Sequence, residues 1–71
     1  MTLTELPAGS MASIISVRLD RLISMGITPG SNVRVLRRTT KCMHIKVGST
    51  EWAIRNSTAE NVTIRIPNEQ D

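Results

Sequence analysis

The sequence predicts a mainly β domain, in which five short strands form a small, partly open barrel with one short α-helix and a late helical turn. Val, Ile and Thr account for 21 of the 71 residues, and these residue types favour strands. Apolar residues alternate with polar ones in several segments, whereas one segment shows helical spacing. Gly, Pro and Ser separate these segments, as expected for short turns.

The composition predicts an aliphatic interior and a single domain. The chain has no Phe or Tyr, one Trp, and four Met that can fill gaps between aliphatic side chains. A chain of this length buries too little surface to enclose a large active site. No interior linker divides it, so we expect one domain over residues 1–67 and a polar tail over residues 68–71.

An apolar anchor, a strand and a helix are predicted first. Leu3 and Leu6 precede a turn at residues 7–10 that contains Gly9. Residues 11–17 are rich in β-branched types and predict a strand with Ala12 and Ile14 on its inner face. Residues 18–25 have helical spacing, which puts three apolar side chains on one side. So short a helix has to dock through them, and they are Leu19, Leu22 and Ile23.

Two turn signals follow the predicted helix. Gly26 comes directly after it, where a glycine in the left-handed conformation commonly ends a helix. Pro29 and Gly30 suit the central positions of a type II turn, because Pro presets φ and Gly supplies a positive φ. Residues 32–36 alternate and predict the second strand.

The third strand lies between two connections of different kinds. Residues 37–42 are polar and predict an exposed loop. Met43, Ile45 and Val47 then alternate with polar residues and predict a strand. Gly48 suits the first central position of a type II′ hairpin turn.

The remaining chain predicts a strand, a helical turn and a last strand. Residues 51–55 alternate, with Trp52 and Ile54 on one face, so Trp52 is expected in the core. Residues 56–60 suit one helical turn with Asn56 or Ser57 as its cap. Residues 61–66 alternate again and complete the barrel, which leaves few unpaired strand edges.

Positive charge is concentrated in the middle of the chain. The net charge is +3, but residues 18–46 hold seven of the nine Lys and Arg residues and one acidic residue, Asp20. Such a segment could meet nucleic acid, an anionic membrane surface or an acidic partner protein. It could also be a solvated face without a partner, because the charges form no dense run.

A specific role in nucleic-acid binding is not expected. Small barrels that bind single strands usually offer aromatic stacking platforms, and the only aromatic residue, Trp52, is predicted in the core. The cations of the middle segment could still touch phosphates without sequence preference.

Cys42 and His44 are the only pair of residues that suggests catalysis or metal binding. They lie two apart on a predicted strand, so both side chains share a face. A nucleophile also needs a base and a group that orients it, and no third group is apparent, so we do not expect an enzyme. Thiolate and imidazole could form a weak Fe²⁺ or Zn²⁺ site, completed by a carboxylate or a second protomer. The simpler interpretation, which we favour, is a small strand residue beside a solvent-facing histidine.

Residues 1–5 lack the basic region and apolar stretch of a signal peptide, and no apolar run is long enough to span a membrane. Its one cysteine cannot form an internal disulfide. We therefore expect a cytoplasmic protein.

The order of the turn residues resembles the FeoA family, the small cytosolic component of bacterial ferrous-iron uptake systems. The similarity covers residues 3–66 and is most specific between Arg21 and Gly30. The matching positions there are Arg21, Leu22, Met25, Gly26, Ile27, Thr28, Pro29 and Gly30, followed by Val33 and Val35. The other matching positions are Leu6, Pro7, Gly9, Ala12, Ile14, Ile45, Val47, Gly48, Trp52, Ala53, Ile54, Arg55, Ala59, Val62 and Ile64.

The resemblance implies an SH3-like barrel and a role in ferrous-iron transport. Members of the family look like adaptors that act with a large permease carrying a GTP-binding domain. The resemblance therefore implies a cytoplasmic protein that lies beside the inner face of the membrane through its permease. The chain departs from the family pattern in two loops: the link at residues 17–21 is short, and the loop at residues 37–44 is unusually basic.

These observations predict a binding module that docks on the cytoplasmic part of a permease. Most candidate contact residues are cations that would steer toward an acidic surface, and Met25 and Leu36 would add apolar contact. The candidate residues are Arg18, Arg21, Met25, Arg34, Leu36, Arg37, Arg38 and Lys41. The alternative is a free-standing regulatory domain that binds another protein or a second copy of itself through an edge strand.

Overall fold

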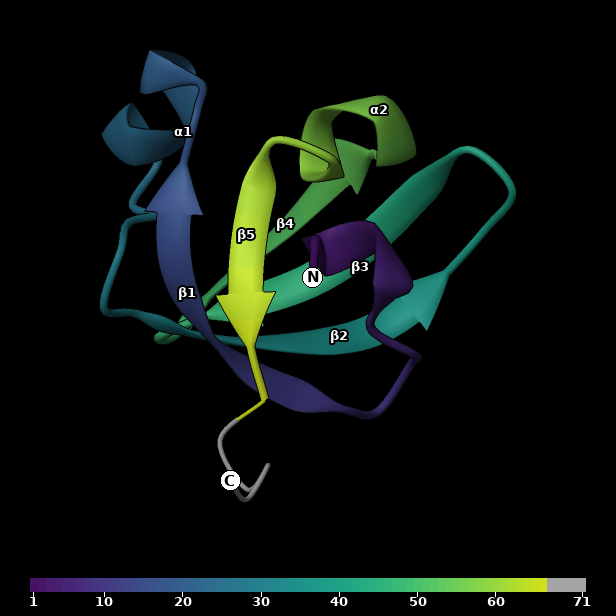
Figure 1. The fold of residues 1–71 in the computed structure, drawn as a ribbon. Coiled ribbons are helices and arrows are strands. Elements are labelled where there is room, and N and C mark those ends of the chain that lie inside the picture. The colour runs from purple at the N-terminus through teal and green to yellow at the C-terminus, as the bar shows by residue number, and fades with distance from the viewer. Residues whose placement is uncertain (67–71) are drawn as a thin grey trace.

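A computed structural model describes residues 1–66 of the chain as a single bent sheet with short helices at its ends (Figure 1). The polar tail predicted over residues 68–71 lies outside the described residues. The strands are β1 (Met11–Val17), β2 (Asn32–Arg38), β3 (Cys42–Val47), β4 (Thr50–Arg55) and β5 (Val62–Arg65). The helices are a 3₁₀ turn, η1 (Leu3–Glu5), and two short α-helices, α1 (Asp20–Ser24) and α2 (Asn56–Ala59).

The five strands form one antiparallel sheet in the order β4-β3-β2-β1-β5, which does not close into a full barrel. The sheet therefore has two edges, β4 and β5. The β5 edge is covered by the start of the chain, because Thr2 pairs with Thr63 and the Ile64 amide donates to the Met1 carbonyl at 2.8 Å. No strand of the described residues pairs with the other side of β4. The predicted partly open five-stranded barrel is confirmed.

The inner face of the bent sheet forms the core. All the buried side chains of residues 1–66 are Leu, Ile, Val, Met or Ala, and none in this range is polar or charged. They include Ala12 and Ile14, as predicted, and the two anchors Leu3 and Leu6. Trp52 is half-buried and packs against the edge of this core. The alternation along the strands therefore places aliphatic side chains in the core, and no aromatic side chain of residues 1–66 is fully buried there.

Helix α1 is shorter than the predicted residues 18–25, and it docks through fewer residues. Leu19 is extended and precedes the helix, and the Arg18 amide donates to the Asn61 carbonyl at 2.9 Å beside β5. Leu22 is buried and Leu19 half-buried, but Ile23 is 42% exposed. The prediction that Ile23 docks the helix is wrong, because a helix of this length presents only one turn to the core.

The turns after α1 have the geometry that their residues favour. Gly26 has a φ of 95°, and its amide donates to the Ile23 carbonyl. The Ile27 amide donates to the Leu22 carbonyl at 3.0 Å. This is a Schellman end, with Leu22 and Ile27 both buried. Gly30 has a φ of 91° and follows Pro29 in a turn closed by the Ser31 amide and the Thr28 carbonyl at 3.1 Å. The two turns fix how α1 returns to β2.

The predicted loop over residues 37–42 is mostly strand, which corrects the sequence interpretation. β2 continues to Arg38 and β3 begins at Cys42, so only residues 39–41 connect them. The Thr39 amide donates to the Cys42 carbonyl at 2.8 Å and closes the hairpin. The polar residues Arg37 and Arg38 belong to the strand because they pair with His44 and Met43 of β3, beyond a β-bulge between Val35 and Arg37.

The cap predicted for α2 is also wrong. The residue that precedes this helix is Arg55, and no side chain caps its first turn. The Asn56 side chain instead donates to the Thr40 carbonyl at 3.1 Å, and the Asn56 amide donates to the Lys41 carbonyl at 2.8 Å. Asn56 therefore ties α2 to the β2–β3 connection rather than capping the helix.

Candidate functional site

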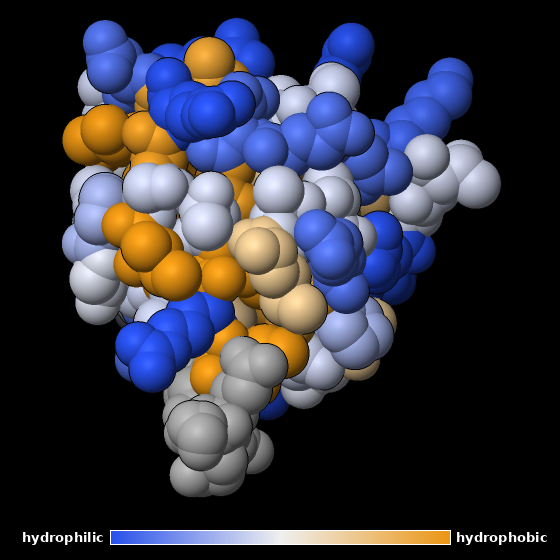
Figure 2. Space-filling model, in the orientation of Figure 1, coloured by the Kyte–Doolittle hydropathy of each residue, from blue (hydrophilic) through white to orange (hydrophobic). Residues whose placement is uncertain are grey.

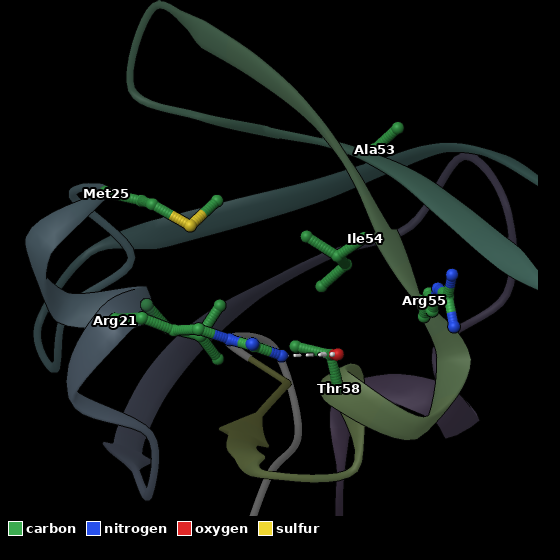
Figure 3. Close-up of a pocket in the computed structure, with 7 residues that line it drawn as sticks. Arg21, Met25, Ala53, Ile54, Arg55 and Thr58 are labelled. Atoms are coloured by element: carbon green, nitrogen blue, oxygen red, sulfur yellow. Dashed lines mark hydrogen bonds between the residues drawn. The ribbon is translucent and has the colours of Figure 1, made fainter.

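A cleft opens where the sheet fails to close, between α1, the unpaired edge of β4, and α2 (Figure 3). Its volume is about 230 Å³. The residues that line it are Arg21, Leu22, Met25, Ala53, Ile54, Arg55 and Thr58. Segments that are far apart in the sequence therefore build one hollow at the edge of the barrel.

The floor of the cleft is apolar and its rim is cationic. Leu22 and Ile54 are buried, and the half-buried Met25 reaches toward β4 from the end of α1 (Figure 3). Arg21 crosses from α1 to α2, where its guanidinium donates to the Thr58 hydroxyl at 3.3 Å. Arg55 lies at the end of β4 on the rim.

The lining of the cleft suits binding better than catalysis. It contains no carboxylate, thiol or imidazole, so the Thr58 hydroxyl, which accepts from Arg21, has no general base in the lining to activate it as a nucleophile. An apolar floor beside fixed cations fits a segment that is partly apolar and carries a negative charge. The open side of β4 also presents main-chain groups to which an extended segment could add as a strand.

A second group of predicted contact residues lies on the outer face of the sheet. Cross-strand pairs place Met11 beside Arg34, Arg34 beside Lys46, and Arg37 beside His44. Leu36 stands at the bulge between Arg34 and Arg37. We call this group the basic sheet face, and it consists of Met11, Arg34, Leu36, Arg37, His44 and Lys46.

The structure therefore divides the eight predicted contact residues among different places. Arg21 and Met25 lie in the cleft, whereas Arg34, Leu36 and Arg37 lie on the basic sheet face. Arg18 is exposed between β1 and α1.

Arg38 and Lys41 lie at the end of the β2–β3 hairpin. The Arg38 side chain bends back to the N-terminal segment, where it donates to the Leu6 carbonyl at 3.1 Å. Lys41 lies in the connection, beside an open hollow of about 400 Å³. Arg38 thus has a structural contact that the sequence did not predict.

In the view of Figure 2 the end of the molecule at the β2–β3 hairpin is mainly hydrophilic, whereas apolar surface gathers on the side of β1 and α1.

Cys42 and His44 share the outer face of β3, as predicted, and both are half-buried. Their cross-strand neighbours include Arg55 opposite Cys42 and Arg37 opposite His44. No group of three or more His, Cys, Asp or Glu side chains within residues 1–66 could hold a metal ion. Two ligands flanked by cations are a poor fit to Fe²⁺ or Zn²⁺, which prefer more donors and an anionic environment.

Sequence reasoning missed five residues of the cleft, which lie in α1, β4 and α2: Leu22, Ala53, Ile54, Arg55 and Thr58. They could not be assigned from alternation, because their place depends on which strand remains unpaired. The resemblance to the FeoA family includes Ala53, Ile54 and Arg55, and it was the one signal that pointed toward part of this set.

Comparison with known proteins places these features in a family. The family model for the FeoA domain matches residues 1–66. A search of curated proteins found no match. None of the helices in the described part of the chain is long and apolar enough to cross a bilayer.

Several solved structures are similar over nearly the whole chain. FeoA of Stenotrophomonas maltophilia, solved with zinc, is 30% identical with a TM-score of 0.84, over 92% of this chain and 89% of that one. It is described as a prokaryotic SH3 domain protein with a suggested role as a ferrous iron transport activating factor. An iron uptake regulatory protein FeoA is 28% identical with a TM-score of 0.83, over 92% and 95% of the two chains. FeoA of Chlorobium tepidum is 27% identical with a TM-score of 0.89, over 100% and 74%.

The match of the family model over residues 1–66 agrees with the five-stranded, unclosed sheet and with the series of glycine turns around α1. The chain belongs to the FeoA family.

Proposed function

We propose that this protein is an adaptor that regulates ferrous-iron transport by binding the cytoplasmic part of a membrane permease through the cleft. The observation that carries the proposal is the apolar hollow beside the unpaired β4 edge, with Arg21 held over it by Thr58. The description of a similar FeoA protein as a transport activating factor supports the link to iron transport. The lining of the cleft supports binding rather than chemistry.

The cleft favours a partner segment with an apolar side chain and a nearby carboxylate. The apolar side chain would pack on the half-buried Met25, above the floor that the buried Leu22 and Ile54 form. The carboxylate would meet Arg21, whose bond to Thr58 already orders the guanidinium and reduces the entropy lost on binding. A charge-assisted bond of this kind sets the register of the partner as well as its affinity.

Calorimetric titration with the cytoplasmic domain of a ferrous-iron permease tests this proposal. The titration is carried out with GDP and with a non-hydrolysable GTP analogue, because the partner domain is expected to bind GTP. Arg21→Glu should weaken binding by at least about tenfold, since it removes the cation and repels the partner's carboxylate. Arg18→Glu is the matched control, because Arg18 is exposed outside the cleft, and it should change affinity less than threefold.

The absence of binding at micromolar concentration in both nucleotide states would contradict the adaptor. Equal effects of the two Arg variants would contradict the cleft as the docking site. A concentration-dependent dimer that Arg21→Glu disrupts would instead favour the free-standing domain, with a second copy in the cleft.

A further inference from the structure

The basic sheet face combines positive charge with apolar side chains that the fold leaves exposed. Arg34, Arg37 and Lys46 are exposed on adjacent strands. Met11 and Leu36 lie beside them and are 43% and 40% exposed. Directly opposed residues on antiparallel strands have Cβ atoms about 5 Å apart, so these side chains form one continuous surface.

The bulge in β2 creates this combination. In a regular strand, Leu36 and Arg37 would point to opposite faces of the sheet. The register shift between Val35 and Arg37 makes Leu36 and Arg37 together oppose His44, and both are exposed. An apolar and a cationic side chain therefore leave the sheet side by side.

The cations of this face are not neutralised by the rest of the described chain. No Lys or Arg forms an ion pair with an Asp or Glu side chain within residues 1–66. Within residues 1–66, the one carboxylate that faces this surface is Glu51, which lies opposite Lys46 on β4. Glu51 also borders the shallow hollow of about 280 Å³ that Leu36, Arg37 and His44 line. The face therefore keeps an excess of positive charge toward solvent.

We infer that the basic sheet face binds the anionic surface of a lipid bilayer. Long Arg and Lys side chains reach phosphate headgroups, while Leu36 and Met11 enter the boundary of the acyl chains, so both kinds of group are satisfied at once. The face is the outer side of a bent sheet, and a fluid surface conforms to such a shape more readily than a folded acidic protein. Each Lys or Arg near an anionic membrane adds a similar increment of binding free energy, so cations spaced along the face all contribute to the affinity.

Binding of this kind would hold the protein at the membrane independently of its partner. The cleft and the basic sheet face adjoin along β4, where Ala53 of the cleft lies opposite His44, but none of the six residues of the face lines the cleft. The protein could therefore rest on the bilayer while the cleft stays accessible. This inference does not depend on the proposed docking, because it concerns other residues and a different ligand.

Co-sedimentation with vesicles tests the inference. The full chain is mixed with vesicles of phosphatidylcholine alone and of phosphatidylcholine with phosphatidylglycerol, at low and at physiological salt. We expect binding to the mixed vesicles only, and weaker binding at the higher salt, since the attraction is largely electrostatic. The double variant Arg34→Gln, Arg37→Gln should lose about thirtyfold in partition coefficient, from the increment of two cations.

Two controls separate a specific face from general charge. Arg18→Gln, Arg21→Gln removes the same charge from exposed residues before and within α1, outside the face, and should cost less than about threefold. Leu36→Ser keeps all the charges and should weaken binding at physiological salt more than at low salt, because the apolar contribution is not screened. Thermal melting of each variant shows whether it remains folded.

Three results would overturn the inference. The first is no sedimentation with anionic vesicles at low salt. The second is an equal loss in the two double variants. The third is a protein that does not bind vesicles but binds DNA or soluble polyglutamate through Arg34 and Arg37. That result would assign the face to a nucleic acid or an acidic protein. Arg21→Glu should change vesicle binding by less than about threefold, because its charge lies away from the face. Failure of the membrane inference and failure of the cleft proposal are therefore distinguishable.

Discussion

The cleft and the basic sheet face differ in how the fold produces them. The cleft depends on buried residues and on turn geometry, because α1 reaches its place only through Leu22, Gly26 and Gly30. The basic sheet face consists of the outward residues of strands whose inward residues already form the core. Substitutions around the cleft should therefore change stability and binding together, whereas substitutions on the face should change binding alone.

The largest expected effect contrasts a buried residue of the cleft with an exposed residue of the face. Leu22→Ala should lower the free energy of unfolding by about 2–5 kcal/mol, because it leaves a cavity under α1. Leu36→Ala should change it by no more than about 0.5 kcal/mol, because the side chain is partly in water already. Urea denaturation of both variants measures the two changes in the free energy of unfolding. Equal losses would contradict the difference between the cleft and the face.

A smaller effect is expected at the turns that position α1. Gly26→Val and Gly30→Val should each cost about 1 kcal/mol or more, because φ values of 95° and 91° are unfavourable for a β-branched residue. Apart from the adjoining residues, no atom lies within 4 Å of a Cβ built at either glycine, so the cost comes from the backbone conformation. Gly26→Asn should cost less than Gly26→Val, since Asn tolerates positive φ better. Unchanged melting temperatures in both Val variants would contradict this explanation.

Arg37 and Arg38 allow a closer comparison, because they are adjacent in the sequence but, within residues 1–66, only the Arg38 side chain has a structural contact. Arg38→Met should lower the free energy of unfolding by about 1 kcal/mol through loss of its bond to the Leu6 carbonyl. Arg37→Met should leave stability within about 0.5 kcal/mol, since Arg37 is exposed on the basic sheet face. Chemical denaturation compares the two, and an equal cost would show that the Arg38 contact is not maintained in solution.

The smallest effect concerns the N-terminal turn that covers the β5 edge. The Thr2 amide donates to the Glu5 carboxylate at 3.0 Å, and this bond lowers the pKa of Glu5. A lowered folded-state pKa gives a stabilising contribution that is present above the unfolded-state pKa and lost as the pH falls through the folded value. The stability difference between the wild type and Glu5→Gln should therefore exist at neutral pH and vanish in acid. A difference that persists at low pH would contradict the assigned cause.

Much of the fold follows from the sequence because local signals agree. The limits of β1 and the sharp turns at Gly26, Gly30 and Gly48 follow from alternation and from residues that tolerate positive φ. The failures concern polar segments whose partners are distant in the sequence. Arg37 and Arg38 extend β2 because β3 lies beside them, and Asn56 leaves its expected cap because Thr40 is nearby.

The candidate site was less predictable than the fold for a physical reason. A cleft at a sheet edge depends on which strand stays unpaired, and that is decided by the curvature of the whole sheet. The sequence named Arg21 and Met25 as candidate contact residues, and both line the cleft. It did not show that they face β4 and α2, because no local pattern encodes a contact between residues 21 and 58.

The central claim is that a transport partner docks in the cleft and leaves the basic sheet face free. Mapping of backbone amide chemical shifts, on addition of the cytoplasmic domain of a ferrous-iron permease, tests it most directly. The account predicts that the largest shifts occur at residues 21–25 and 53–58, with little change at Arg34 and Lys46. Shifts concentrated on Arg34, Arg37 and Lys46, or no shifts at saturating partner, would contradict it.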